Sequence, residues 1–236
     1  MYKNKSSAQL KQIARGIMIG KYRNAISVLL ASNLIISTLS LFTTTASSSY
    51  WGQILGLIIS FILVLFGTIL NVGQCSFYLN IACDGPYHFS NLFNGFKVHP
   101  DKIIITQIII RILSTIPLVP AVIFLVVFIY SSEITLLFFI GCLLLILGGT
   151  LSWWLYLCYS QVYYLLLDFP DYSAKELLKM SRRLMKGHCG RLLYIQVSFL
   201  PLMLAGLLSF GLGFLLIQPY QNMVYTLFYL DIISND

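Results

Sequence analysis

The sequence predicts an all-α fold, a polytopic transmembrane helical bundle with about six spans arranged as three hairpins. Of the 236 residues, 58% are hydrophobic and 10% are charged, whereas a soluble domain carries about 25% charged residues. Several apolar runs also exceed the roughly 20 residues that cross about 30 Å of hydrocarbon. These observations exclude a water-soluble protein, and residues 1–236 are expected to form a single integral membrane domain.

The first 23 residues form a basic amphipathic segment, because they contain six lysines and arginines and no acidic residue. Ser6 and Gln9 have the spacing of a capping box, and apolar residues follow at helical intervals. This pattern predicts a helix that lies on a membrane surface. A cleaved secretory signal is the rival interpretation, but the long basic lead and the long apolar run behind it favour a retained span.

Six spans follow from the apolar runs and from the polar residues that interrupt them. The spans are expected near residues 24–42, 53–82, 103–130, 135–167, 188–208 and 212–232. The last two come from one apolar block, 192–232, which is too long for a single crossing and contains glycines where a turn can form. Each second span also ends in an aspartate, namely Asp84, Asp168 or Asp231, which suggests an internal repeat of three hairpins.

The segment 173–187 is expected to be a second amphipathic helix, interfacial and cytoplasmic. Ser173 and Glu176 match a capping box, and Gly187 is a suitable stop. Leucines occupy one face, and the other face carries Lys175, Lys179, Arg182, Arg183 and Lys186. These basic residues are candidates for contact with anionic phospholipid headgroups of the bilayer.

The distribution of positive charge predicts the topology. Six of the 15 lysines and arginines precede the first span, two lie between the second and third spans, and six lie between the fourth and fifth. The three remaining connections contain none, so the positive-inside rule places both termini in the cytoplasm. The net charge of +7 is therefore a feature of membrane topology, and no nucleic-acid partner is expected because no binding signature accompanies it.

Arg111 is the candidate functional residue inside the spans, because ionisable groups are rare and costly within a bilayer. It lies about eight positions into the third span, or about 12 Å deep at 1.5 Å per residue. Gln107 precedes it by one helical turn, and Asp84 and Asp168 are the acids expected within its reach. These four residues form the candidate polar site. The alternative is an arginine that extends to the cytoplasmic headgroups.

Other polar side chains leave two interpretations open. Asn71, Gln74, Gln161, Gln196, Gln218, Gln221 and Asn222 lie in or near the spans. Such amides either join helices through hydrogen bonds or line a polar path. The tryptophans and tyrosines are interpreted as interfacial belts.

No catalytic or cofactor-binding motif is present in the sequence. The five cysteines are scattered singly, without metal-ligand spacing, and the acids and histidines do not cluster. No cofactor, no metal and no enzymatic activity are therefore expected.

Several short stretches resemble a family of bacterial integral membrane proteins known as domain of unknown function 975. The matching stretches are Asp168-Phe-Pro170, Ser181 to Gly187, Ser198-Phe199, Gly211-Leu-Gly213, Pro219-Tyr220 and Phe228-Tyr229. The chain departs from that pattern at His188-Cys-Gly190 and at Pro201. The resemblance implies a helical membrane architecture and a bacterial plasma membrane, and it supplies no catalytic residues.

Three functions remain compatible with the sequence. The first is a non-enzymatic accessory, regulatory or immunity and stress-type protein, with another membrane protein as its partner. The second is a small-molecule or lipid carrier whose polar site surrounds Arg111. The third is an intramembrane enzyme that acts on lipid. A cavity that reaches Arg111 favours the carrier, whereas a sealed bundle favours the first function.

The topology can be tested with reporter fusions placed before the first span and after Asn235. Both fusions should report a cytoplasmic location, because an even number of crossings returns the chain to its starting side. An external carboxy-terminal reporter would show that block 192–232 crosses only once.

Overall fold

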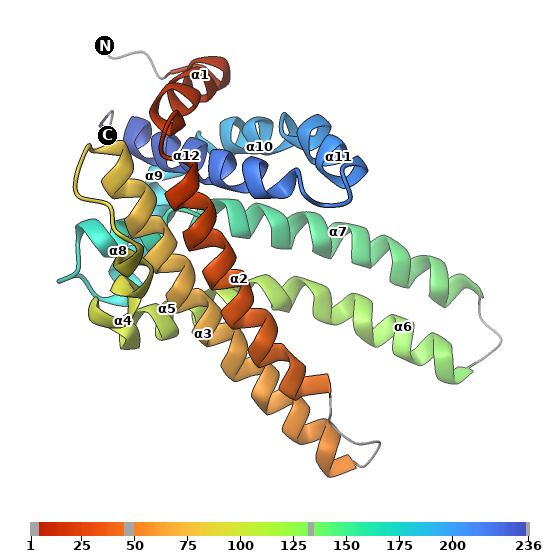
Figure 1. Ribbon diagram of the computed structural model, residues 1–236. Helices are drawn as coiled ribbons and strands as arrows, with labels where there is room; N and C mark the ends of the chain where they lie inside the picture. Colours follow the sequence, from red (N-terminus) through yellow and green to blue (C-terminus); the bar gives the residue numbers. More distant parts are fainter. Residues whose placement is uncertain (1–4, 45–49, 132–134, 235–236) are drawn as a thin grey trace.

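The computed structural model describes residues 5–44, 50–131 and 135–234. Within these ranges every regular element is a helix (Figure 1). The predicted all-α membrane fold is confirmed, since five helical segments are long and apolar enough to span a bilayer. These segments are Tyr22–Leu41, Trp51–Ala82, Pro100–Ile129, Leu136–Asp168 and Cys189–Leu208.

The first two hairpins follow the predicted apolar runs within a few residues. The first hairpin consists of α2 (Tyr22–Thr44) and α3 (Tyr50–Ala82). The outgoing arm of the second hairpin consists of α5 (Pro100–Thr115), η2 (Ile116–Leu118) and α6 (Val119–Ser131). Its returning arm consists of α7 (Thr135–Tyr159) and α8 (Val162–Asp168).

The third hairpin differs from the other two in its returning arm. Its elements are α10 (Cys189–Val197), α11 (Leu200–Leu208) and α12 (Phe214–Ile233). The sixth expected span, 212–232, is thus a helix, but α12 is not among the five apolar segments. Gln218, Gln221, Asn222 and Asp231 lower its hydropathy, and more than half of its 20 residues are buried inside the protein. Protein contacts therefore replace the lipid contacts of an ordinary span.

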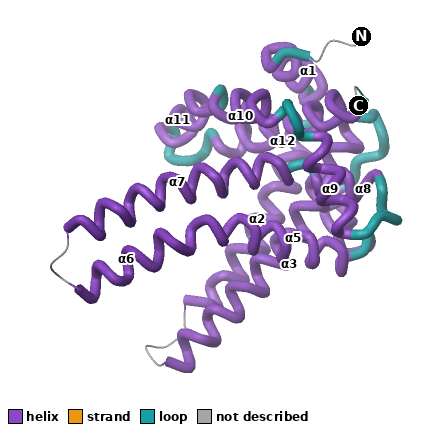
Figure 2. Tube along the Cα trace, turned by 180° about the vertical axis from the view of Figure 1, so that it is seen from behind, coloured by secondary structure: helices purple, strands orange, loops and turns teal. Residues whose placement is uncertain are grey.

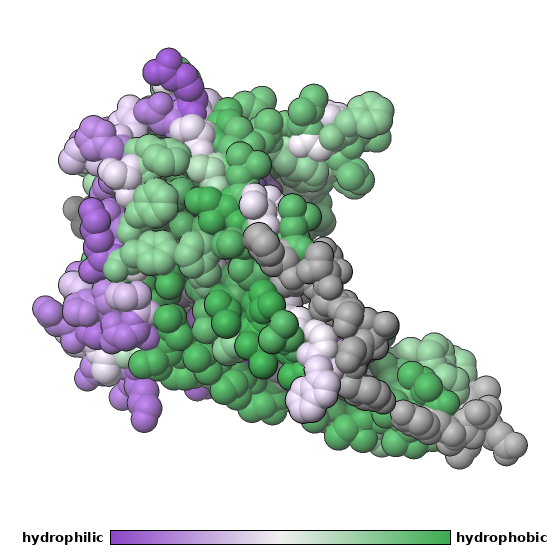
Figure 3. Space-filling view, turned by 60° about the horizontal axis from the view of Figure 1, so that its bottom comes forward, coloured by the Kyte–Doolittle hydropathy of each residue, from purple (hydrophilic) through white to green (hydrophobic). Residues whose placement is uncertain are grey.

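The hairpins extend from a common polar end. We define the polar end as the side that contains α1, α4 and α9 together with Lys5 and Ser234, the two ends of the described chain (Figure 1). The opposite ends of the hairpins are their tips, and α2–α3 diverges from α6–α7 toward these tips in both views (Figures 1 and 2). Hydrophobic side chains cover the hairpins, whereas hydrophilic ones gather along one side of the molecule (Figure 3).

Helix α9 (Ala174–Leu184) has the predicted cap and the predicted amphipathic faces. The backbone N–H and the hydroxyl of Ser173 donate to the Glu176 carboxylate, and these bonds lower the pKa of Glu176. The apolar face packs against α5, α7 and α8, where Leu177 is buried and the Ser181 hydroxyl donates to the Cys158 carbonyl over 3.0 Å. The apolar face of α9 therefore packs against protein and does not contact lipid. The exposed face carries Lys175, Lys179, Arg182, Arg183 and Lys186.

Helix α1 (Ser7–Met18) covers the third hairpin in the same manner. Residues 1–4 of the predicted basic segment lie outside the described residues, but the capping box of Ser6 and Gln9 is formed. Leu10 and Met18 are buried against neighbouring helices, mainly α12. The ammonium group of Lys11 donates to the carbonyl of Ser198 over 3.1 Å. Both amphipathic helices thus close the polar end of the bundle.

An ion pair between Arg191 and Asp231 joins α10 to α12 at the polar end. The pair is largely buried, and the Lys5 backbone N–H donates to both carboxylate oxygens of Asp231 over 3.3 Å. Arg191 also donates to the Lys5 carbonyl. One carboxylate therefore connects the amino-terminal segment with both arms of the third hairpin.

Glycines allow the closest approaches between segments. The short helices η1 (Phe89–Phe93) and α4 (Asn94–Lys97) pack on α3. A Cβ at Gly73 would lie 1.8 Å from the Leu92 carbonyl oxygen, so only glycine allows that contact.

Gly148 and Gly149 provide a matched test of close packing in the second hairpin. A Cβ at Gly148 would lie 2.3 Å from the Pro117 carbonyl oxygen, whereas a Cβ at Gly149 would meet no atom within 4 Å. Gly148→Ala should therefore lower the melting temperature of the purified protein, at an overpacking cost of about 1–3 kcal/mol. Gly149→Ala should change the free energy of unfolding by no more than about 0.5 kcal/mol. Equal melting of the two variants would contradict this packing of α7 on η2.

Candidate functional site

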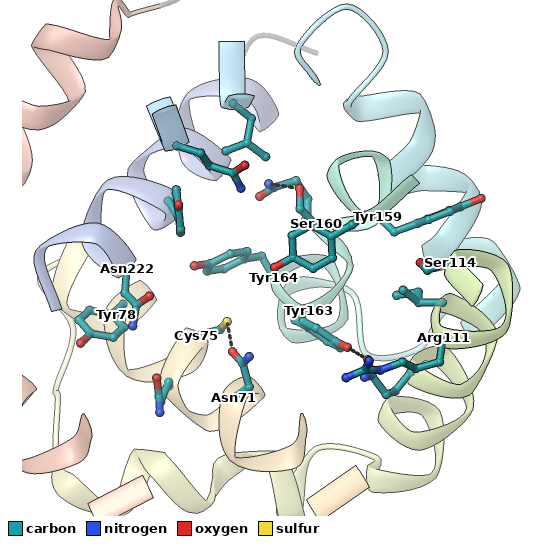
Figure 4. Close-up of a pocket in the computed structure, with 18 of the residues that line it drawn as sticks. Asn71, Cys75, Tyr78, Arg111, Ser114, Tyr159, Ser160, Tyr163, Tyr164 and Asn222 are labelled. Carbon is teal, nitrogen blue, oxygen red and sulfur yellow. Dashed lines mark hydrogen bonds between the residues drawn. The ribbon is translucent and has the colours of Figure 1, made fainter. Parts of the chain in front are cut away.

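A cavity of about 370 Å³ lies among α3, α5, α7, α8, α10 and α12 (Figure 4). Its lining is unusually polar for the interior of a membrane domain. It contains three serines at positions 114, 152 and 160, six tyrosines at positions 78, 156, 159, 163, 164 and 225, and six amide side chains at positions 71, 74, 107, 161, 196 and 222. Polar groups inside a bilayer are stable only where they face protein, ligand or water.

Arg111 supplies the formal charge of the cavity. The lining includes this one arginine and no aspartate, glutamate or lysine. Within the described residues, no hydrogen bond or ion pair to the Arg111 guanidinium is formed. Tyr163 donates instead to Gln107, the residue one turn before Arg111. The cavity therefore has a net formal charge of one positive unit.

The cavity is closed toward the polar end and open toward the hairpin tips. Along α3, which runs toward the polar end, Asn71 is exposed while Cys75 and Tyr78 are buried. Along α5, which runs the other way, Gln107 is buried and Arg111 is exposed. On both helices the lining residue nearer the polar end is buried, and the cavity opens at the level of Asn71 and Arg111, where Tyr156 of α7 is also exposed. Arg111 lies at the open edge, eleven residues beyond Pro100 and about 16 Å along α5 at 1.5 Å per residue.

A break between two helices forms the closed end. Helix α7 ends at Tyr159 and α8 begins at Val162, so Ser160 and Gln161 form a turn inside the domain. The Gln161 Nε2 donates to Ser160 Oγ over 2.8 Å, while Gln161 Oε1 is buried without a hydrogen-bond partner in the described structure. The interruption is local, because Gln161 keeps a right-handed helical backbone and Leu136–Asp168 remains one spanning segment.

Hydrogen bonds and stacking hold the wall formed by α8 and α12. The Tyr164 hydroxyl lies 3.1 Å from Thr226 Oγ1, and the Tyr164 ring stacks on Tyr229 with centroids 4.9 Å apart. On the opposite wall, Ser152 donates to the Ser114 carbonyl over 2.6 Å and joins α7 to α5. These contacts fix the cavity walls without occupying its centre.

The four residues of the predicted polar site separate into two groups. Arg111 and Gln107 both line the cavity. Asp84 lies at the surface with 91% of its side chain exposed and pairs with Lys21 over 3.5 Å, and Asp168 accepts a hydrogen bond from Tyr229. The expected contact between Arg111 and one of these acids is not formed in the described structure, because both acids end their helices while Arg111 lies deeper.

Most of the cavity lining was ambiguous in the sequence. The structure places five of the seven candidate amides in the cavity, namely Asn71, Gln74, Gln161, Gln196 and Asn222, whereas Gln218 and Gln221 lie outside its lining. Six tyrosines interpreted as belt residues also line it. The dense polar series from Tyr156 to Tyr164, at the end of an apolar run, was the available signal.

Comparison with known proteins identifies one family. The family model described as "Protein of unknown function (DUF975)" matches residues 1–236, which agrees with the resemblance of the short motifs. No curated protein and no solved structure matches the chain.

The unpaired state of Arg111 predicts that its removal leaves the fold intact. Arg111→Gln should change the free energy of unfolding by no more than about 0.5 kcal/mol, because no buried carboxylate loses a partner. Asp231→Asn, in contrast, breaks a buried pair, which typically costs about 3–5 kcal/mol. Thermal unfolding of the detergent-solubilised variants measures the difference. Comparable destabilisation by both substitutions would reveal a structural partner for Arg111.

Proposed function

We propose that this chain, which belongs to the DUF975 family of proteins of unknown function, is a non-enzymatic membrane protein of the carrier type that binds an anionic polar ligand. The observation that carries the proposal is the polar cavity with Arg111 at its open edge. Its volume of about 370 Å³ falls within the range of roughly 300–1,000 Å³ found for small-ligand sites.

The charge of the cavity supports an anion as the ligand. A guanidinium group within a membrane domain is costly unless an opposite charge or water compensates for it. The lining contains no carboxylate, so a negatively charged ligand group would provide the compensation. The planar fork of the guanidinium suits carboxylates and phosphates.

The chemistry of the lining supports binding over catalysis. Most of the lining residues carry an amide or a hydroxyl, and such groups orient a ligand through hydrogen bonds. General acid–base catalysis needs a group whose pKa lies near the working pH, usually a histidine or carboxylate. The break between α7 and α8 adds support for a carrier, because carriers use interrupted helices at their binding sites.

The polar end supports a cytoplasmic location for both termini, and the family resemblance is the ground for proposing a bacterial plasma membrane. The two ends of the described chain meet at Asp231, and the basic face of α9 is exposed on the same side of the molecule (Figure 1). Exposed lysines and arginines at this level suit contact with anionic headgroups, each worth about 1 kcal/mol. The accessory function with a membrane protein partner has no comparable feature in its support.

Native mass spectrometry of the purified protein tests the proposal. The wild-type protein should retain one bound molecule per chain. Arg111→Gln should lose most of it, because a hydrogen bond to a charged group contributes about 1.5–3 kcal/mol, or roughly tenfold or more in affinity. Arg23→Gln is the matched control, since Arg23 is exposed, lies outside the cavity lining and is not part of the basic face of α9. A wild-type protein without a bound molecule, or equal retention in both variants, would contradict the proposal.

A further inference from the structure

We infer that the ligand of the cavity is the headgroup of a phospholipid with one negative charge and a hydroxylated alcohol, and that it enters sideways from the bilayer. This inference rests on the proposed binding function and names its ligand class. Three features carry it: the surroundings of the opening, the single charge, and an unsatisfied acceptor at the closed end.

The opening of the cavity faces a space with apolar walls. On the tip side of the cavity, α2–α3 and α6–α7 diverge (Figures 1 and 2). Most exposed side chains of α3 between Ile54 and Val64 are large and apolar, as are most of those of α7 between Leu136 and Leu151, and Ser60 and Thr150 are the small polar exceptions in these two ranges. Water in that space would contact these side chains unfavourably, whereas acyl chains would not. A ligand that enters through it therefore carries its own hydrocarbon.

The charge of the lining selects among lipid headgroups. A phosphodiester carries one negative charge, which matches Arg111 as the single cation of the lining. The guanidinium fork can bind two phosphate oxygens at once. A headgroup with an ammonium would place a positive charge in a cavity that has no carboxylate to receive it. A monoanionic phosphodiester with a neutral alcohol fits these constraints.

The closed end requires a hydrogen-bond donor from the ligand. Gln161 is 2% exposed, and its Oε1 has no partner in the described structure. A buried acceptor without a donor is destabilising. A headgroup hydroxyl can donate to this oxygen, while the Tyr78 hydroxyl, which also lines the cavity and is buried without a partner in the described structure, can donate to another headgroup oxygen. The phosphate thus lies at the open edge and the alcohol reaches the closed end.

Competition between defined lipids tests this arrangement in the purified full-length protein. The probes are phosphatidylglycerol, phosphatidylmethanol, phosphatidylcholine and the deacylated glycerophosphoglycerol, and the readout is their relative occupancy by native mass spectrometry. Phosphatidylmethanol keeps the single negative charge but lacks headgroup hydroxyls. Wild-type protein should bind phosphatidylglycerol about tenfold more tightly than phosphatidylmethanol, and phosphatidylcholine more weakly than both.

Two substitutions should remove the two preferences separately. Arg111→Gln should abolish the preference for anionic lipid over phosphatidylcholine. Gln161→Leu should keep that preference but equalise phosphatidylglycerol and phosphatidylmethanol. If Gln161→Leu does not fold, Tyr78→Phe removes a buried hydroxyl at the same end and should reduce the same preference.

Other outcomes overturn the inference while leaving the proposed function intact. Glycerophosphoglycerol that binds as tightly as phosphatidylglycerol would show a water-soluble ligand. Phosphatidylcholine bound equally well in wild-type protein would remove the charge argument, and phosphatidylmethanol bound equally well would remove the hydroxyl argument. Failure of the proposed function is a different result. In that case the wild-type protein retains no bound molecule in native mass spectrometry, or retains one that Arg111→Gln does not remove.

Discussion

The buried ion pair between Arg191 and Asp231 holds the polar end of the bundle together. It connects the beginning of α10 with the end of α12, and through Lys5 it also fixes the segment before α1. Helix α12 in turn packs on α1, α2 and α3 and contributes Asn222 and Tyr225 to the cavity. The position of one cavity wall therefore depends on a charge pair outside the cavity.

The cavity lining includes the point in the second hairpin at which α7 ends and α8 begins. At Ser160 and Gln161 the chain turns, and α8 continues toward the polar end. The residues around the turn are therefore polar on several sides, which a straight lipid-facing helix could not tolerate.

The helices were predictable from sequence because local rules determine them, whereas the cavity depends on how the helices are rotated. Capping residues such as Ser6 and Ser173 mark helix starts through contacts within four residues. In contrast, Gln161 and Gln221 look alike in the sequence, yet the first lines the cavity and the second bonds to Tyr225. The partner of Asp168 was likewise missed, because Tyr229 reaches it from a distant helix.

The bond between Lys5 and Asp231 has a consequence for the order of assembly, because the two residues are 226 positions apart. At a synthesis rate of about 5–20 residues per second, α12 is made roughly 10–45 s after α1. During that interval α12, the main packing partner of α1, has not yet been made. The segment before α1 is therefore made well before its partner, and α12 must be synthesised before the polar end can close.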